Sequence, residues 1–235
     1  LLTAGHKILA ATGRSDDNPV VVEGKVLTSG GSLPLDVTIL LEAAAICMAH
    51  AARNSFNRCV LLGNGQRRNL PVNLVPEGRI ATGFGPVIKL AGEIFSRVLS
   101  MSNPVSAQSL VVASGMEDEA AFLPLVIERF GRQVEAVKRL SALEALLSAQ
   151  AMDILGDKPG GGPKMLYDIV RKHADFYVVD RPLSSEVEAI EEELSSERVV
   201  GDLAAQVPIA SIDDFFALCP HPRDNSQRLP DALSA

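Results

Sequence analysis

The 235-residue sequence contains no Trp, and aromatic residues make up only 4% of it, although 47% of its residues are hydrophobic. A sizeable core must therefore be built from Ala, Leu, Val and Ile, which suits closely packed helices. The excess of Ala and Leu on several helix faces also indicates buried subunit contacts. A chain of this length forms one large domain or two small ones.

Positive charge and cysteine are also scarce. The 22 Lys and Arg oppose 29 Asp and Glu, for a net charge of -7, whereas a nucleic-acid-binding protein needs clustered cations to replace phosphate counterions. Cys47, Cys59 and Cys219 are widely spaced and form no CxxC pair, which argues against a disulfide framework and a zinc site. We find no signal peptide and no apolar run of transmembrane length. We expect a cytoplasmic protein with no nucleic-acid or membrane partner and no metal.

Hydrophobic periodicity of about 3.6 residues predicts a mainly helical chain. It opens with Leu1-Leu2 and no Met, inside a segment that reads as a helix, so we expect a part of a longer protein. A short hairpin is predicted over 20–27, and a Gly/Pro-rich linker between helices over 156–163. Helices are predicted at 1–13, 37–53, 87–98, 117–155 with a kink at Pro124, 166–173, and 184–194 with Ser184 or Ser185 as N-cap.

Several short motifs resemble, in order and spacing, those of the aromatic amino-acid lyase family, especially its histidine ammonia-lyases. They are Asp17-Asn18-Pro19, Asn69-Leu70-Pro71, Thr82-Gly83-Phe84, Glu117-Asp118, Ala149-Gln150 and Asp180-Arg181-Pro182-Leu183. The resemblance covers about residues 1–195, which we interpret as the C-terminal helical part of a lyase-like domain. Residues 196–235 are predicted to be a tail with a short helix at 211–218.

The resemblance implies an all-α fold, a long antiparallel helical bundle with a small β-hairpin near the N-terminus, assembled as a homotetramer. It implies a carbon–nitrogen lyase that removes the α-amino group and a β-proton from an aromatic amino acid. The electrophile of such enzymes is 4-methylidene-imidazol-5-one (MIO), which forms from an Ala-Ser-Gly segment. We expect it in a missing N-terminal half or companion chain, so this fragment alone should be inactive.

Two strings resemble the MIO precursor, but neither fits it. Ala113-Ser114-Gly115 has the tripeptide, yet Met116 follows it where Asp-Leu-Ala is usual. Residues 201–204, Gly-Asp-Leu-Ala, have the continuation without the preceding Ala-Ser. Cyclisation needs all three residues in one strained turn, so both strings are interpreted as chance matches.

Four residues match site positions of the family. Glu117 falls on the Glu of a Gln-Glu-Asp motif, which implies a catalytic acid–base role and favours histidine as substrate. Leu33 falls where histidine lyases place a Phe against the substrate ring, and Ser32 and Met116 fall on neighbouring substrate-binding positions. Without the resemblance, Glu117 would be explained by the positive N-terminal end of the helix predicted to begin there.

The departures from the family pattern leave an alternative open. Met116 stands where the family has Gln and cannot make the hydrogen bonds of an amide. Gly115, Glu119 and Pro34 replace Asn, His and His. The chain is therefore either a divergent lyase or a non-catalytic helical scaffold or interaction subunit that retains the lyase fold.

Overall fold

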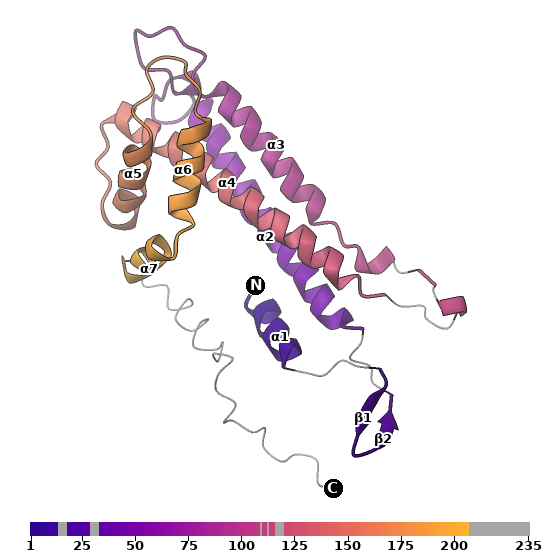
Figure 1. Ribbon diagram of the computed structural model, residues 1–235. Coiled ribbons are helices and arrows are strands. Elements are labelled where there is room, and N and C mark those ends of the chain that lie inside the picture. Colours follow the sequence, from indigo (N-terminus) through magenta and orange to yellow (C-terminus); the bar gives the residue numbers. More distant parts are fainter. Residues whose placement is uncertain (14–17, 29–32, 109, 112, 116–119, 207–235) are drawn as a thin grey trace.

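The computed structural model describes residues 1–13, 18–28, 33–108, 110–111, 113–115 and 120–206 (Figure 1). The described helices are α1 (Leu2–Thr12), α2 (Leu35–Gly63), α3 (Gly85–Met101), α4 (Leu123–Leu155), α5 (Gly161–His173), α6 (Ser184–Leu194) and α7 (Glu197–Gln206). Strands β1 (Val20–Val22) and β2 (Lys25–Leu27) pair antiparallel. Glu23 and Gly24 have positive φ, as the turn of a two-residue hairpin demands. The predicted fold class is confirmed.

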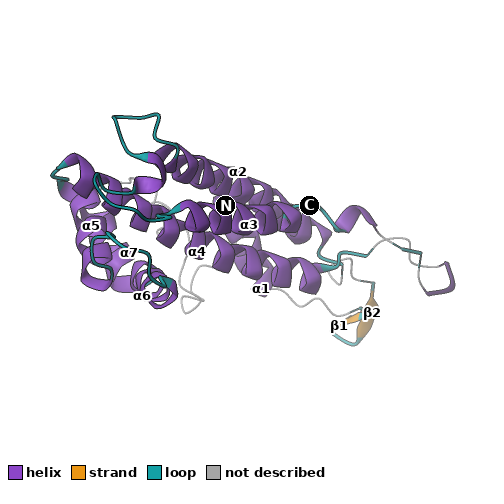
Figure 2. Cartoon of the chain, turned by 90° about the horizontal axis from the view of Figure 1, so that it is seen from above, coloured by secondary structure: helices purple, strands orange, loops and turns teal. Residues whose placement is uncertain are grey.

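Three long helices, α2, α3 and α4, lie side by side, with α5 to α7 gathered at one end and the hairpin at the other (Figure 2). Helices α2 and α4 are parallel, because Val37 packs with Val126 near their beginnings and Ser55 donates a hydrogen bond to Glu144 further along. Helix α3 runs antiparallel to both. Fully buried small and aliphatic residues fill the space between them, among them Ala52, Ala91, Val98, Leu140 and Leu147.

Helix α2 extends ten residues beyond the predicted end at Arg53. Tertiary packing explains the extension: Cys59 is fully buried and Phe56 stacks on Phe95 with ring centroids 5.5 Å apart. At Gly63 a Cβ would come within 2.1 Å of the end of the Ile88 side chain, so a larger residue in this close crossing of α2 and α3 would require Ile88 to move. By length and composition α2 could cross a membrane, contrary to the expectation from sequence, but it packs here against α3 and α4 as core helices do.

Helix α4 begins at Leu123 rather than at Glu117, and the predicted kink at Pro124 is wrong. Pro124 lies in the first turn, where a helix N–H has no intrahelical partner and proline is well tolerated. The helix ends at Gly156, a left-handed C-cap at φ 67°, so 156–160 is a linker between helices, as predicted.

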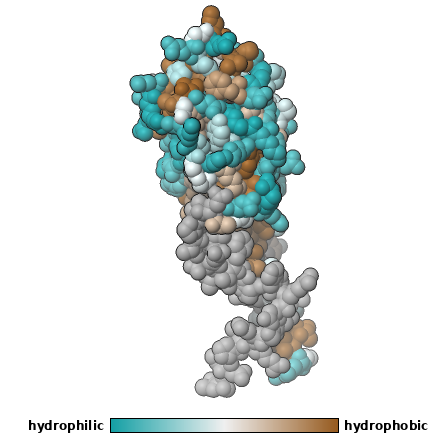
Figure 3. Space-filling model, turned by 90° about the vertical axis from the view of Figure 1, so that its left-hand side faces the viewer, coloured by the Kyte–Doolittle hydropathy of each residue, from teal (hydrophilic) through white to brown (hydrophobic). Residues whose placement is uncertain are grey.

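The last helices differ from prediction in detail. Helix α5 begins at Gly161, five residues before the predicted start, and α6 has the predicted bounds but no side-chain cap from Ser184 or Ser185. Helix α7 was not predicted, and the helix expected at 211–218 lies outside the described residues. The side formed by these helices is mainly hydrophilic, with small apolar patches between hydrophilic residues (Figure 3).

Candidate functional site

Leu33 lies where the chain enters α2, at the end of the bundle where α2 and α4 begin and α3 finishes; this is called the Leu33 end. The Leu33 side chain is 45% exposed. At the same end, Val37 and Leu41 of α2 pack with Val126 of α4, and α1 contributes Ile8 to this apolar cluster. Leu33 thus precedes the first α2 residue of an apolar cluster by four residues.

A buried carboxylate organises the same end. Glu42 of α2 is 8% exposed and accepts hydrogen bonds from the N–H of Val105 at 2.7 Å and the hydroxyl of Ser106 at 2.6 Å. Burial opposes ionisation of Glu42, but these hydrogen bonds outweigh it and hold its pKa below the usual value. Arg129 of α4 donates to the carbonyls of Ser100 and Asn103. The turn that leaves α3 is thus fixed by both neighbouring helices.

Three of the four predicted site residues, Ser32, Met116 and Glu117, lie outside the residues that the structure describes. The described chain resumes at Leu33, two residues before α2 begins, and at Ala120, three residues before α4 begins. The first turn of α4 holds no acidic residue. Glu117 and Asp118 therefore do not belong to the first turn of α4. The explanation from sequence, that they are acidic residues favoured by the positive end of this helix, does not apply.

The Leu33 end exposes several large apolar side chains. Ile39 on α2 and Leu125 and Ile127 on α4 are all exposed, as are the hairpin residues Val21 and Val26. A two-stranded hairpin is only marginally stable by itself in water. Clusters of exposed apolar groups mark surfaces that contact another molecule or chain segment.

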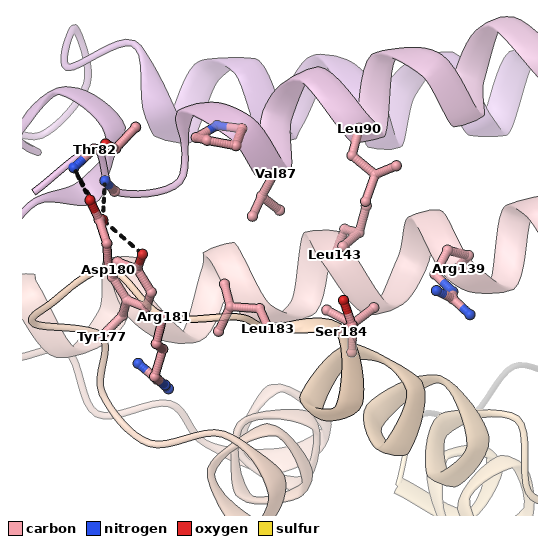
Figure 4. Close-up of a pocket in the computed structure, with 13 residues that line it drawn as sticks. Thr82, Val87, Leu90, Arg139, Leu143, Tyr177, Asp180, Arg181, Leu183 and Ser184 are labelled. Atoms are coloured by element: carbon pink, nitrogen blue, oxygen red, sulfur yellow. Dashed lines mark hydrogen bonds between the residues drawn. The ribbon is translucent and has the colours of Figure 1, made fainter.

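The opposite end, called the Asp180 end, carries a groove of about 560 Å³ between α3, α4 and α6 (Figure 4). Val87 and Leu90 of α3, Leu143 of α4 and Val187 of α6 contribute apolar side chains to its wall. The guanidinium groups beside it are already paired, since Arg139 binds Glu191 and Arg181 binds Glu186 at 3.0 Å. Within the described part of the chain, this groove therefore offers apolar surface but no unpaired arginine.

Asp180 lies at one end of the groove, where it acts as a tether between two segments that are distant in sequence (Figure 4). Its carboxylate accepts from the backbone N–H groups of Thr82 at 2.8 Å and Gly83 at 3.1 Å, and from the Tyr177 hydroxyl at 2.9 Å. These donors, the Thr82 N–H first, lower the pKa of Asp180 to about 2. With this pKa, Asp180 is ionised at neutral pH, and its oxygens are occupied by hydrogen bonds. It therefore suits a structural role rather than that of a catalytic acid or base.

Gln150 makes a second connection at this end and is fully buried. Its amide accepts from the N–H of Tyr177 at 3.0 Å and donates to the carbonyl of the same residue at 2.9 Å. The motifs that contain Thr82, Gln150 and Asp180 thus meet in space and hold the scaffold together.

Sequence reasoning missed Glu42, Arg129 and Gln133. Gln133 of α4 is fully buried and donates to the carbonyls of Ala45 and Val98, which joins all three long helices. A polar residue in an otherwise apolar stretch, such as Glu42 after three hydrophobic residues and before three alanines, was the available signal.

Comparison with known proteins agrees with this arrangement. The sequence profile of the family described as aromatic amino acid lyase matches residues 3–172. Histidine ammonia-lyase from Myxococcus xanthus is 31% identical over 201 residues, which cover 83% of this chain and 38% of that protein. The chain spans about 38% of the length of the curated relatives it matches.

Two solved structures extend the comparison. Histidine ammonia-lyase from Trypanosoma cruzi superposes with a TM-score of 0.80 at 22% identity, over 97% of this chain and 47% of that one, and so has the same fold. The ergothioneine-degrading enzyme ergothionase from Treponema denticola superposes with a TM-score of 0.72 at 26% identity, over 79% of this chain and 38% of that one. Because the family profile covers most of the sequence, the chain belongs to the aromatic amino acid lyase family.

Proposed function

We propose that this chain is the helical part of a carbon–nitrogen lyase that deaminates an aromatic amino acid without oxidation, with histidine as the favoured substrate. The family match over residues 3–172 carries the proposal, and relatives with the printed activity of histidine ammonia-lyase support it. Glu117 rather than Gln at its motif position favours histidine, because a carboxylate can hold an imidazole or exchange a proton with it.

In this proposal the substrate ring lies against the Leu33 end. Leu33 supplies an apolar wall, Ser32 and Met116 contact the substrate, and Glu117 handles a proton. The exposed apolar side chains at this end support the assignment, since they need a cover that excludes water from the reacting groups. Glu42 and Arg129 hold the turn after α3, from which the chain continues toward Glu117.

The described residues do not fit formation of the MIO electrophile. The tripeptide Ala113-Ser114-Gly115 is a single exposed turn, with no buried side chain in it. Gly201 and Asp202 lie inside helix α7, where a strained cyclising turn cannot form. We place MIO, which would supply the electrophile, on a missing N-terminal half or companion chain.

The same proposal includes a homotetramer. Helix α2 exposes Ile39, Ala43 and Ile46, at i, i+4 and i+7, on the side away from α3 and α4. Ile39 is 51% and Ile46 42% exposed. Such a stripe is the pattern of a helix that packs against another helix, and it supports contacts between subunits. A cytoplasmic location stays a prediction.

Mass spectrometry of the complete native protein, with an ammonia-release assay, tests the proposed function. If the protein is a lyase, a peptide containing an Ala-Ser-Gly segment should be lighter by the mass of two water molecules. The protein should also release ammonia from histidine or another aromatic amino acid. An unmodified protein that releases no ammonia would instead establish the alternative, a non-catalytic scaffold. Met116 in place of Gln is the residue that keeps this alternative in view.

A further inference from the structure

Another apolar hollow runs along the flank of α4, apart from the groove beside Asp180. Two adjoining depressions of about 430 and 380 Å³ share Glu144, Ser148 and Met152. Together they form what is called the α4 flank groove. It lies between α5, α6 and α7 on one side and the end of α2 on the other.

The groove is hollow because its floor is made of short side chains. Ser141, Ala145 and Ser148 follow each other at i, i+4 and i+7 on one face of α4, and the longer Met152 ends this row. Longer apolar residues rise on the two sides, with Leu166 on α5 and Leu61 on α2. The shape and lining are those of a groove that accepts the apolar face of a helix.

The rim on the α2 side is positively charged. Arg58 binds Glu144, and Arg68 binds Asp157 at 2.5 Å, so these two are neutralised in place. Arg67 lines the same rim, and among the described residues its side chain has no ion-pair partner. The groove therefore combines an apolar floor with a net positive edge, and favours an apolar segment that also carries acid.

The chain itself supplies such a segment. Helix α7 ends at Gln206, and Leu203, three residues earlier, is part of the groove wall. Residues 207–235 follow and lie outside the described residues. Their sequence places Ile212, Phe215, Phe216 and Cys219 at i, i+3, i+4 and i+7, the spacing of one helix face. Asp213 and Asp214 lie between these apolar positions in the sequence.

We propose that residues 211–219 dock into the α4 flank groove of the same chain, with Phe215 and Phe216 on the floor and the acidic pair toward Arg67. Five residues separate Gln206 from Ile212, and an extended chain covers at most about 3.6 Å per residue, so the segment stays within roughly 20 Å of the groove wall. A tether this short gives an effective concentration in the millimolar range, so even a weak contact is populated. This inference is independent of the proposed reaction.

Thiol cross-linking tests the docking directly, because Cys219 lies in the segment. The exposed Cys47 is removed by Cys47→Ala, and Cys59 is fully buried and does not compete. Ser148→Cys then places a thiol on the groove floor, while Ser96→Cys on the exposed side of α3 serves as the matched control. A short bismaleimide is added, and the rates of linkage from Cys219 to position 148 and to position 96 are compared by peptide mapping.

Docking predicts linkage to position 148 at least about 10-fold faster than to position 96, and a similar loss of rate in Phe215→Ser/Phe216→Ser. Asp213→Lys/Asp214→Lys should also slow it, more at low than at high salt. Equal rates at the two positions, or no response to the Phe changes, would overturn the proposal. Mixed isotope-labelled chains identify the occupant, since links formed only between chains would assign the groove to a second copy. Unchanged circular dichroism in each variant excludes misfolding.

Discussion

The backbone N–H of Thr82 is held by both carboxylate oxygens of Asp180, at 3.1 and 2.8 Å, although the two residues are 98 positions apart in sequence. The contact joins the loop that starts α3 to the segment that starts α6. Both residues belong to motifs by which the sequence resembles its family. At this end of the molecule the resemblance therefore reflects the demands of the scaffold.

Asp180→Asn should lower the thermal unfolding midpoint at pH 7, because the amide keeps only one acceptor oxygen for the three donors. The folded pKa of Asp180 is about 2, against an ordinary 3.8. A lowered carboxyl pKa stabilises the fold above the ordinary value, and the stabilisation is lost as pH falls from about 3.8 to 2. The difference in thermal unfolding midpoint between wild type and Asp180→Asn should therefore narrow as the pH falls through that range. Asp175→Asn, an exposed carboxylate in the same segment, is the control; a gap that stays constant with pH would contradict the tether.

Gln150→Leu should destabilise the protein more than Gln133→Leu. The first change leaves the N–H and the carbonyl of Tyr177 without their partner, and a buried orphaned group costs about 1–3 kcal/mol. Gln133 donates to Val98 in the last turn of α3 and to Ala45 within α2, where the carbonyl already lies in a helical ladder. Urea unfolding of both variants gives the comparison, and equal losses would show that the Gln150 bonds carry no special weight.

The sequence predicts the fold well because periodicity and breakers act locally. These local patterns are enough to predict the hairpin, α3, α6 and the end of α4 at Gly156. The length of α2 cannot be predicted in this way, because its later turns are stabilised by packing against α3 and α4, which buries Ser55 and Cys59. Likewise, α4 begins at Leu123 rather than at Glu117 because Pro124 favours a position in the first turn of a helix. The acidic pair Glu117-Asp118 led to the earlier predicted start, because acidic residues are also typical of a first turn.

The candidate site is less predictable, for a physical reason. Leu33 lies two residues before α2 begins, and its predicted role as a pocket wall stays a prediction. An isolated sequence does not reveal which distant backbone groups a carboxylate will meet. Glu42 meets residues 105 and 106, and Asp180 meets residues 82 and 83. Both pairings depend on how the long helices cross. The roles of Ser32, Met116 and Glu117 stay predictions.

Glu42→Gln should cost about 1–3 kcal/mol of unfolding free energy, because the amide nitrogen that replaces Oε2 cannot accept from the hydroxyl of Ser106. The pKa of Glu42 lies below its ordinary 4.5, so this contribution is present above pH 4.5 and is lost as pH falls below it. Glu77→Gln in an exposed loop is the matched control. Chemical denaturation at pH 7 and pH 4 measures both, and a variant as stable as the control would contradict the role of Glu42.

Ile46→Asp should reduce the number of subunits in the assembled protein, because it places a charge in the exposed apolar stripe of α2. Asn57→Asp, on an exposed position of the same helix, adds the same charge beyond the stripe and should leave assembly intact. Light scattering after size-exclusion chromatography gives the mass of each variant. If Ile46→Asp keeps the wild-type mass, α2 is not the subunit contact.

Glu117→Gln, made in the complete enzyme, should lower turnover by about 10²- to 10⁴-fold, the usual contribution of a general acid or base, with a smaller change in KM. The amide preserves the size of the side chain and removes its proton exchange. The pH dependence of kcat should lose one limb if Glu117 titrates during the reaction. Glu135→Gln, on the exposed surface of α4 two turns beyond the residues of the Leu33 end, removes an equivalent charge away from the proposed site. Because the first turn of α4 contains no acidic residue, a loss of helix stabilisation in that turn cannot account for a fall in turnover. Unchanged kcat would assign the acid–base work to a residue outside this chain.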